Sequence, residues 1–137
     1  FSSKNNLKEM VLATSKNHRN QILKDLIERV NFKNVIVMGS IGCKIASILR
    51  GESDIYICLS LHGGSAPKDW DFAAPEAILR ASGGMITNIN CQELSYGNLN
   101  FIQSGIIVAT NNAALHKKIC LDIKEIIKKY DLYPLDN

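Results

Sequence analysis

The chain has 137 residues, of which 46% are hydrophobic and 21% are charged. These values are typical of one soluble globular domain, so they argue against a disordered chain, a collagen and a coiled coil. Sixteen basic residues against 13 acidic residues leave a net charge of +3, and this small charge, spread along the chain, predicts neither a nucleic-acid partner nor a membrane partner.

The first half of the chain predicts three strands that alternate with helices. Three short apolar runs are typical of buried strands, at residues 10–13, 35–38 and 54–59. Residues 18–30 carry apolar side chains at helical spacing, which predicts an amphipathic helix. A second helix is expected to begin with residues 44–49, after the glycine-rich residues 39–42, and to end at Gly51.

The second half predicts two more helices and two more strands. Residues 70–82 form an apolar helical segment, which the glycine pair at residues 83–84 is expected to end. The predicted strands are residues 85–89 and 106–110. The asparagines at residues 111–112 supply an N-cap for a last helix, whose five lysines we interpret as a solvated face.

Strands that alternate with helices predict an α/β fold, with a largely parallel or mixed sheet of about five strands and helices on both faces. In such sheets, ligands bind beyond the carboxyl ends of the strands, in the turns that lead into helices. Three turns of this kind are expected, at residues 14–18, 39–44 and 68–76.

The first two turns carry groups that bind anions. Ser15 and His18 lie at the start of a helix, where both side chains and the free backbone N–H groups can donate to a phosphate oxygen. In the second turn two glycines allow close approach of the backbone, and Lys44 adds a positive charge, although the spacing is not that of a P-loop. The structural alternatives are an N-cap in the first turn and a tight turn with a solvated lysine in the second, and the sequence leaves them open.

The third turn places Asp71 beside Trp70 at the start of a helix, with two alanines following at residues 73–74. Asp71 is either the N-cap of this helix or a metal ligand. One carboxylate does not complete a Mg²⁺ site, so the other ligands of such an ion must come from elsewhere.

These residues resemble a known family signature. Trp70, Asp71, the alanine pair at residues 73–74 and the glycine pair at residues 83–84 occur in the order of the C-terminal signature of the inositol monophosphatase superfamily, whose members are Mg-dependent, lithium-sensitive phosphatases. Residues 74–79 and the first two turns resemble the bisphosphate nucleotidases of that superfamily. Those enzymes act in sulfur metabolism, where they remove the 3′-phosphate of 3′-phosphoadenosine 5′-phosphate. The resemblance covers essentially the whole chain and implies the C-terminal domain of the sugar-phosphatase fold.

The resemblance also implies roles for individual residues. Asp71 is implied to be catalytic and to be the metal ligand that bridges Mg²⁺ to the scissile phosphate. Five residues are implied to hold the nucleotide through its phosphate and ribose, namely Ser15, His18, Ser40, Gly42 and Lys44.

One element of the family is absent from the chain. The Asp-Pro-X-Asp-Gly metal-binding element belongs to an N-terminal domain, and no Asp-Pro pair occurs in these residues. We therefore expect residues 1–137 to be a single C-terminal domain, inactive without the missing N-terminal domain. Two alternatives remain, an inositol or sugar monophosphatase of the same superfamily and a non-catalytic nucleotide-binding module.

The cysteines and the opening residue bear on the cellular context. Four cysteines stand 15, 33 and 29 positions apart, at Cys43, Cys58, Cys91 and Cys120, so we expect reduced, mostly buried thiols and a cytoplasmic protein. No run of residues is apolar enough to predict a membrane span. The chain begins at Phe1, and we expect it to be an excerpt from a longer protein.

Overall fold

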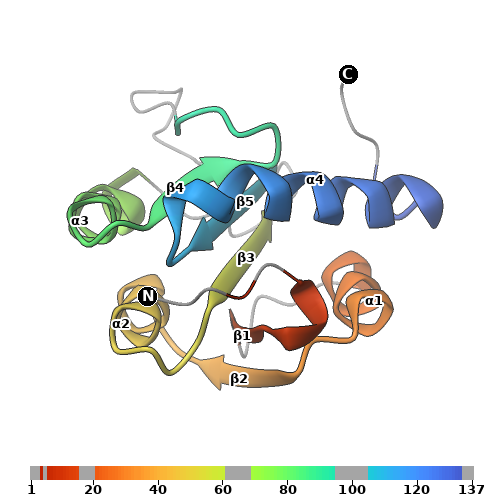
Figure 1. Ribbon diagram of the computed structural model, residues 1–137, viewed down its shortest axis with the longest axis horizontal. Coiled ribbons are helices and arrows are strands. Elements are labelled where there is room, and N and C mark those ends of the chain that lie inside the picture. Colours follow the sequence, from red (N-terminus) through yellow and green to blue (C-terminus); the bar gives the residue numbers. More distant parts are fainter. Residues whose placement is uncertain (1–3, 5, 16–20, 61–68, 95–104, 134–137) are drawn as a thin grey trace.

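A five-stranded sheet with the order β2-β1-β3-β5-β4 runs through the molecule (Figure 1). The computed structural model describes residues 4, 6–15, 21–60, 69–94 and 105–133. Its strands are β1 Val11–Ser15, β2 Asn34–Met38, β3 Ile55–Ser60, β4 Met85–Asn88 and β5 Gly105–Thr110.

Helices cover both faces of this sheet. They are the short 3-10 helix η1 Leu7–Glu9 and the α-helices α1 Gln21–Val30, α2 Ile41–Leu49, α3 Asp69–Ala81 and α4 Ala113–Lys129. α1 and α4 pack on one face, and α2 and α3 pack on the other (Figure 1). None of the described helices is long and apolar enough to span a bilayer.

The strand directions confirm the expected α/β fold in its mixed form. β1 pairs in parallel with β2 and with β3, whereas β5 runs antiparallel to β3 and to β4. Four strands therefore share one direction, and β5 alone runs the opposite way. The parallel half of the sheet, built by β1, β2 and β3, is the half that the sequence links through α1 and α2.

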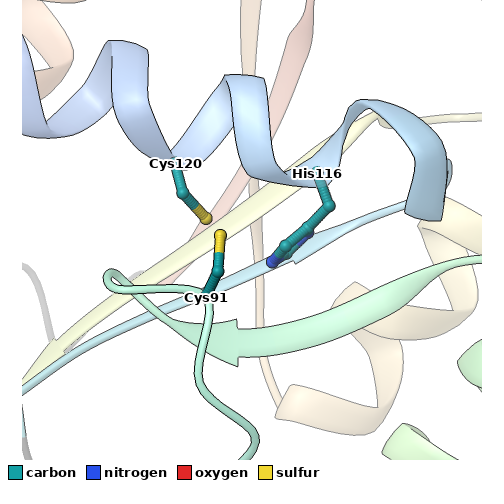
Figure 2. Close-up of side chains that lie close together, drawn as sticks. All are labelled: Cys91, His116 and Cys120. Carbon is teal, nitrogen blue, oxygen red and sulfur yellow. The ribbon is translucent and has the colours of Figure 1, made fainter.

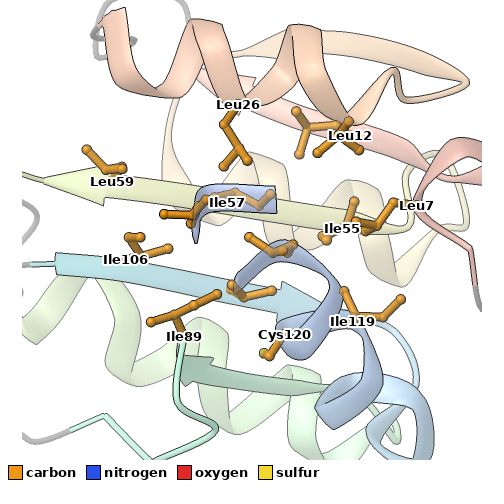
Figure 3. Packing of buried hydrophobic residues seen from close by; sticks show 14 of the residues in the cluster. Leu7, Leu12, Leu26, Ile55, Ile57, Leu59, Ile89, Ile106, Ile119 and Cys120 are labelled. Carbon is orange, nitrogen blue, oxygen red and sulfur yellow. The ribbon is translucent and has the colours of Figure 1, made fainter. Parts of the chain in front are cut away.

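Alternation along β3 explains why both faces of the sheet are covered. Ile55, Ile57 and Leu59 join the core under α1 and α4 (Figure 3). Tyr56 and Cys58 point to the other face and join the core under α2 and α3. Successive side chains of a strand point to opposite faces, so a strand buried on both sides needs apolar residues at nearly every position.

α2 begins earlier than predicted, at Ile41 instead of Lys44. The reason is Ser40, whose Oγ accepts a hydrogen bond from the backbone N–H of Cys43 at 3.1 Å and so caps the helix. Gly42 consequently lies in the first helical turn and not in an open loop. The predicted end of this helix is confirmed, because Gly51 follows it with a φ of +77°.

The glycine pair at residues 83–84 is required where α3 meets β4. Gly83 has a φ of +92°, which favours glycine. A Cβ on Gly84 would lie 2.6 Å from the carbonyl oxygen of Thr110 and 2.6 Å from Cδ1 of Leu79. The pair therefore ends the helix and lets the chain pass close to the end of β5.

A histidine is buried between α4 and the sheet. His116 is completely buried, and its Nε2 lies 2.7 Å from Oγ1 of Thr87 on β4, while its Nδ1 lies 2.8 Å from Oγ1 of Thr110 on β5. Burial, with a smaller contribution from the charge of Arg80, lowers the pKa of His116 from 6.5 to about 4. The imidazole is therefore neutral at neutral pH.

We expect the free energy of unfolding to fall as the pH drops from 6.5 towards 4. The unfolded chain binds a proton at this histidine near pH 6.5, whereas folded His116 resists protonation until about pH 4. Protons therefore favour the unfolded state in this window, by up to roughly 3 kcal/mol at its acid end. Urea titrations over this range, with EDTA present, should show a steeper pH dependence for the wild type than for His116→Gln. Equal pH dependence in the two proteins would contradict the assignment.

Candidate functional site

The three predicted turns emerge from one edge of the sheet, where the parallel strands end. β1 ends at Ser15, α2 begins just after the end of β2, and α3 begins at Asp69 after β3. Because β1, β2 and β3 are parallel, their carboxyl ends share this edge. It is the edge at which open α/β sheets bind ligands.

Lys44 is a buried residue, so the alternative of a solvated lysine is wrong. It is 2% exposed, and its Nζ donates a hydrogen bond to the carbonyl oxygen of Gly39 at 2.8 Å. The same Nζ lies 5.1 Å from the centroid of the Tyr56 ring, within the range of a cation–π contact. Burial lowers the pKa of Lys44, and electrostatic interactions with Cys58 and Cys43 oppose this shift.

Tyr56 interacts with three of the predicted site residues, although no motif in the sequence indicates it. The residue is 2% exposed, and burial raises the pKa of its phenol well above 10. Interactions with Cys58 and the charge of Asp71 raise it further, and a hydrogen bond with Ser15 opposes the rise. Tyr56 therefore stays protonated and lies within interaction range of Ser15, Lys44 and Asp71. The period-two alternation of β3, which places residue 56 on the face of α2, is the signal that could have found it.

Asp71 lies in the first turn of α3 and is half-buried. The next residue, Phe72, is completely buried in the core under α2 and α3, and it fixes this turn against the sheet. A carboxylate is favourable at the N-terminal end of a helix and is an oxygen ligand of the kind that Mg²⁺ prefers. Within the described parts of the chain, no group of three ligand side chains forms around Asp71. The residues thus fit one ligand of a Mg²⁺ ion and not a complete site.

The structure assigns different surroundings to the remaining predicted residues. The Oγ of Ser40 is engaged in capping α2. A Cβ at Gly42 would have Ser40 Oγ as its nearest neighbour, at 3.7 Å, so the first turn of α2 is open to an approaching group. His18 lies outside the described residues. Ser15 is buried at the end of β1, with 9% of its surface exposed. The ligand roles of all these residues stay predictions.

A cavity of about 490 Å³ lies at the opposite edge of the sheet. It is lined by the C-terminal ends of α2 and α3 and by Asp54 and Asn111, and it contains none of the predicted site residues. The candidate site is therefore defined by the convergence of side chains around Tyr56 and not by this cavity.

Comparison with known proteins identifies close similarities. A family model described as the inositol monophosphatase family matches residues 2–128. The chain is 32% identical over 104 residues to mouse 3′(2′),5′-bisphosphate nucleotidase 1, an overlap that covers 74% of this chain and 32% of the mouse protein. It is also 32% identical over 87 residues to the 3′(2′),5′-bisphosphate nucleotidase of Emericella nidulans, covering 62% of this chain and 24% of that protein.

Solved structures share the fold. A Thermotoga maritima IMPase superposes with a TM-score of 0.68 at 22% identity, covering 93% of this chain and 45% of the other. The SaIMPase-II structure with bound inositol monophosphate gives the same TM-score and identity, covering 93% of this chain and 46% of the other. The chain thus spans about a third of the length of the mouse relative and less than half of these structures.

Proposed function

Because the chain belongs to the inositol monophosphatase family, we propose that it is the C-terminal domain of a two-domain phosphatase that converts 3′-phosphoadenosine 5′-phosphate to AMP and phosphate. Family membership supports phosphate-ester hydrolysis. The choice of substrate is supported by the curated relatives, which are named as bisphosphate nucleotidases at 32% identity. The absence of disulfides among the four cysteines supports a reducing compartment, and we propose the cytoplasm.

One observation carries this proposal, the gathering of an ammonium, a hydroxyl and a carboxylate around Tyr56. Lys44 is held within 5.1 Å of the ring, Ser15 is hydrogen-bonded to the phenol, and the charge of Asp71 acts on it. A bisphosphate nucleotide carries two anionic groups joined by a ribose. Lys44, the hydroxyl of Ser15 and the N-terminal end of α2 supply the donors and the positive charge that such a ligand needs.

Asp71 is the residue that would hold Mg²⁺, as one oxygen ligand among several. When bound, the ion would supply positive charge that polarises a phosphoryl oxygen. Lys44 and Ser15 would bind and orient the nucleotide without reacting. The remaining ligands would come from the N-terminal domain, so we expect the 137-residue chain alone to release no phosphate.

The test is Mg-dependent phosphate release by the protein in which this chain is joined to an N-terminal metal-binding domain. It compares 3′-phosphoadenosine 5′-phosphate with inositol 1-phosphate, with and without lithium, and includes the chain alone. We expect kcat/KM to be higher for the nucleotide than for inositol 1-phosphate. We also expect lithium to abolish the release of phosphate. Preference for the inositol ester would move the assignment to an inositol monophosphatase. Binding of the nucleotide without hydrolysis would favour a non-catalytic nucleotide-binding module.

Lys44 should contribute to nucleotide selectivity. Replacing it with methionine keeps the buried aliphatic stem but removes the ammonium, so we expect KM for the bisphosphate nucleotide to rise about 10-fold, as for the loss of one charge-assisted hydrogen bond. KM for inositol 1-phosphate should change much less. Steady-state kinetics on both substrates checks this. Equal losses on both would mean that Lys44 only shapes the turn through its bond to Gly39.

A further inference from the structure

Two cysteines and one histidine meet on the face of the sheet opposite the candidate site. His116 and Cys120 lie one helical turn apart on α4, and Cys91 lies in the segment that follows β4. Their ligand atoms all lie within 4.8 Å of one another. Figure 2 shows the two thiols and the imidazole ring turned towards the same space. None of the four cysteines forms a disulfide. Within the cluster, Cys120 is 1% exposed and Cys91 is half-buried.

The ring nitrogen that faces the thiols is Nε2 of His116. Its hydrogen-bond partner, Oγ1 of Thr87, lies 2.7 Å from Nε2 and 3.9 Å from Sγ of Cys120. The other nitrogen, Nδ1, bonds to Thr110 on the far side of the ring. His116 therefore presents one ring nitrogen to two sulfur atoms.

We propose that Cys91, His116 and Cys120 form a binding site for one Zn²⁺ ion. Thiolate sulfur and imidazole nitrogen are the ligands that Zn²⁺ takes in proteins, whereas Mg²⁺ takes oxygen ligands. Tetrahedral coordination needs sulfur atoms about 3.8 Å apart and sulfur–nitrogen distances of about 3.6 Å. The observed limit of 4.8 Å is within about 1 Å of this geometry, so small side-chain movements complete it.

The charges of such a site balance. Binding releases one proton from each thiol to solvent, and the two thiolates together with the neutral ring offset the two positive charges of the ion. A neutral cluster is the form in which charge can be buried at low cost. The half-buried position of Cys91 leaves a side from which the ion and a fourth ligand, such as water, can enter.

The surroundings of His116 favour coordination through Nε2. Coordination there leaves the proton on Nδ1, which donates to Oγ1 of Thr110, and Thr110 can donate onward to the carbonyl oxygen of Asn112 at 3.5 Å. Metal-bound histidines commonly have a partner of this kind on the second nitrogen. Thr87 loses its bond to Nε2 but keeps its donation to the carbonyl oxygen of Asn88 at 2.7 Å. The hydroxyls of Thr87 and Thr110 therefore both keep a partner after the exchange.

This site is separate from the proposed Mg²⁺ ligand. His116 and Cys120 belong to α4 and Cys91 packs against the same core, whereas Asp71 belongs to α3 on the other face of the sheet. A bound Zn²⁺ would join the segment after β4 to α4, and would do so whether or not the phosphatase assignment holds.

The test uses Co²⁺ as a spectroscopic probe and then Zn²⁺ as its competitor, on the reduced chain. We expect one equivalent of Co²⁺ to give a thiolate-to-cobalt charge-transfer band and tetrahedral visible bands, which equimolar Zn²⁺ removes and excess Mg²⁺ does not. Cys120→Ser should lose the charge-transfer band of the wild type, and Cys43→Ser, which changes an exposed cysteine on α2, should keep it. Asp71→Asn should also keep the band, which separates this site from the phosphatase proposal.

A matched pair of valine variants distinguishes coordination from mere proximity. Thr110→Val removes the partner of Nδ1 and should weaken Zn²⁺ binding about 10- to 100-fold. Thr87→Val removes a group that competes for Nε2 and should leave the affinity unchanged or higher. In the wild type, Zn²⁺ should protect Cys91 from maleimide while Cys43 stays reactive. Any one of three results would overturn the proposal. These are the absence of a thiolate-to-cobalt band in the folded wild type, equal Zn²⁺ affinities in the two valine variants, and labelling of Cys91 by maleimide in the presence of Zn²⁺.

Discussion

Replacing Asp71 with asparagine should lower kcat/KM for phosphate release at least about 100-fold in the two-domain enzyme. Partners outside the ligand shell of a metal already contribute about 10- to 100-fold, so a ligand that carries negative charge should contribute no less. Asparagine keeps the size of the side chain and one carbonyl oxygen but removes the charge that attracts the cation. Steady-state rates measured over a range of Mg²⁺ concentrations check the prediction, because the variant should also need more Mg²⁺ for half-maximal activity.

Asp122→Asn is the matched control for this variant. Asp122 lies on α4, on the other face of the sheet, where it pairs with Lys118 at 2.7 Å near the surface. The same chemical change there should leave kcat/KM and the Mg²⁺ requirement unchanged, because surface ion pairs contribute little. An Asp71→Asn enzyme with wild-type rates and a wild-type Mg²⁺ requirement would remove Asp71 from the metal site.

Replacing Phe72 with alanine should lower the free energy of unfolding by about 3 to 5 kcal/mol, the usual range for truncating a buried phenylalanine. The side chain is completely buried in the core under α2 and α3. Its removal deletes apolar contacts and leaves a cavity at the turn that carries Asp71. Urea denaturation followed by circular dichroism measures the change.

Ile78→Ala is the control on the same helix. Ile78 is 54% exposed, so its truncation should change the free energy of unfolding by less than about 0.5 kcal/mol. Similar losses from the two substitutions would contradict the assignment of Phe72 as the residue that anchors the start of α3. In that case the position of Asp71 would have to depend on other contacts.

The sequence predicts the sheet well because its strands are short apolar runs separated by strong turn residues. The end of α2 at Gly51 and the end of α3 at the glycine pair are confirmed, since positive φ values and a close approach demand glycine there. The start of α2 was predicted too late because Ser40 reads as part of a loop until its capping bond to Cys43 is seen. Local hydrogen bonds of this kind have only a weak sequence signature.

The candidate site is less predictable because it depends on contacts between distant segments. The sequence leaves open whether Lys44 is solvated, and only the packing of α2 on β3 shows that its ammonium is buried against Tyr56. The expectation of mostly buried cysteines holds for Cys58 and Cys120 but is wrong for exposed Cys43 and half-buried Cys91. Local patterns predict elements, but which side chains meet is decided by tertiary packing.

The position of β5 between β3 and β4 has a consequence for the order of folding. β4 has β5 as its strand neighbour in the sheet, yet Met85–Asn88 precedes Gly105–Thr110 in the chain. During synthesis from the N-terminus, β1, β2 and β3 can associate as they appear, whereas β4 waits for a later segment. This half of the sheet therefore closes only after residue 110 has left the ribosome. A nascent chain that stops earlier leaves one edge of β3 unpaired and leaves β4 without β5 as its neighbour.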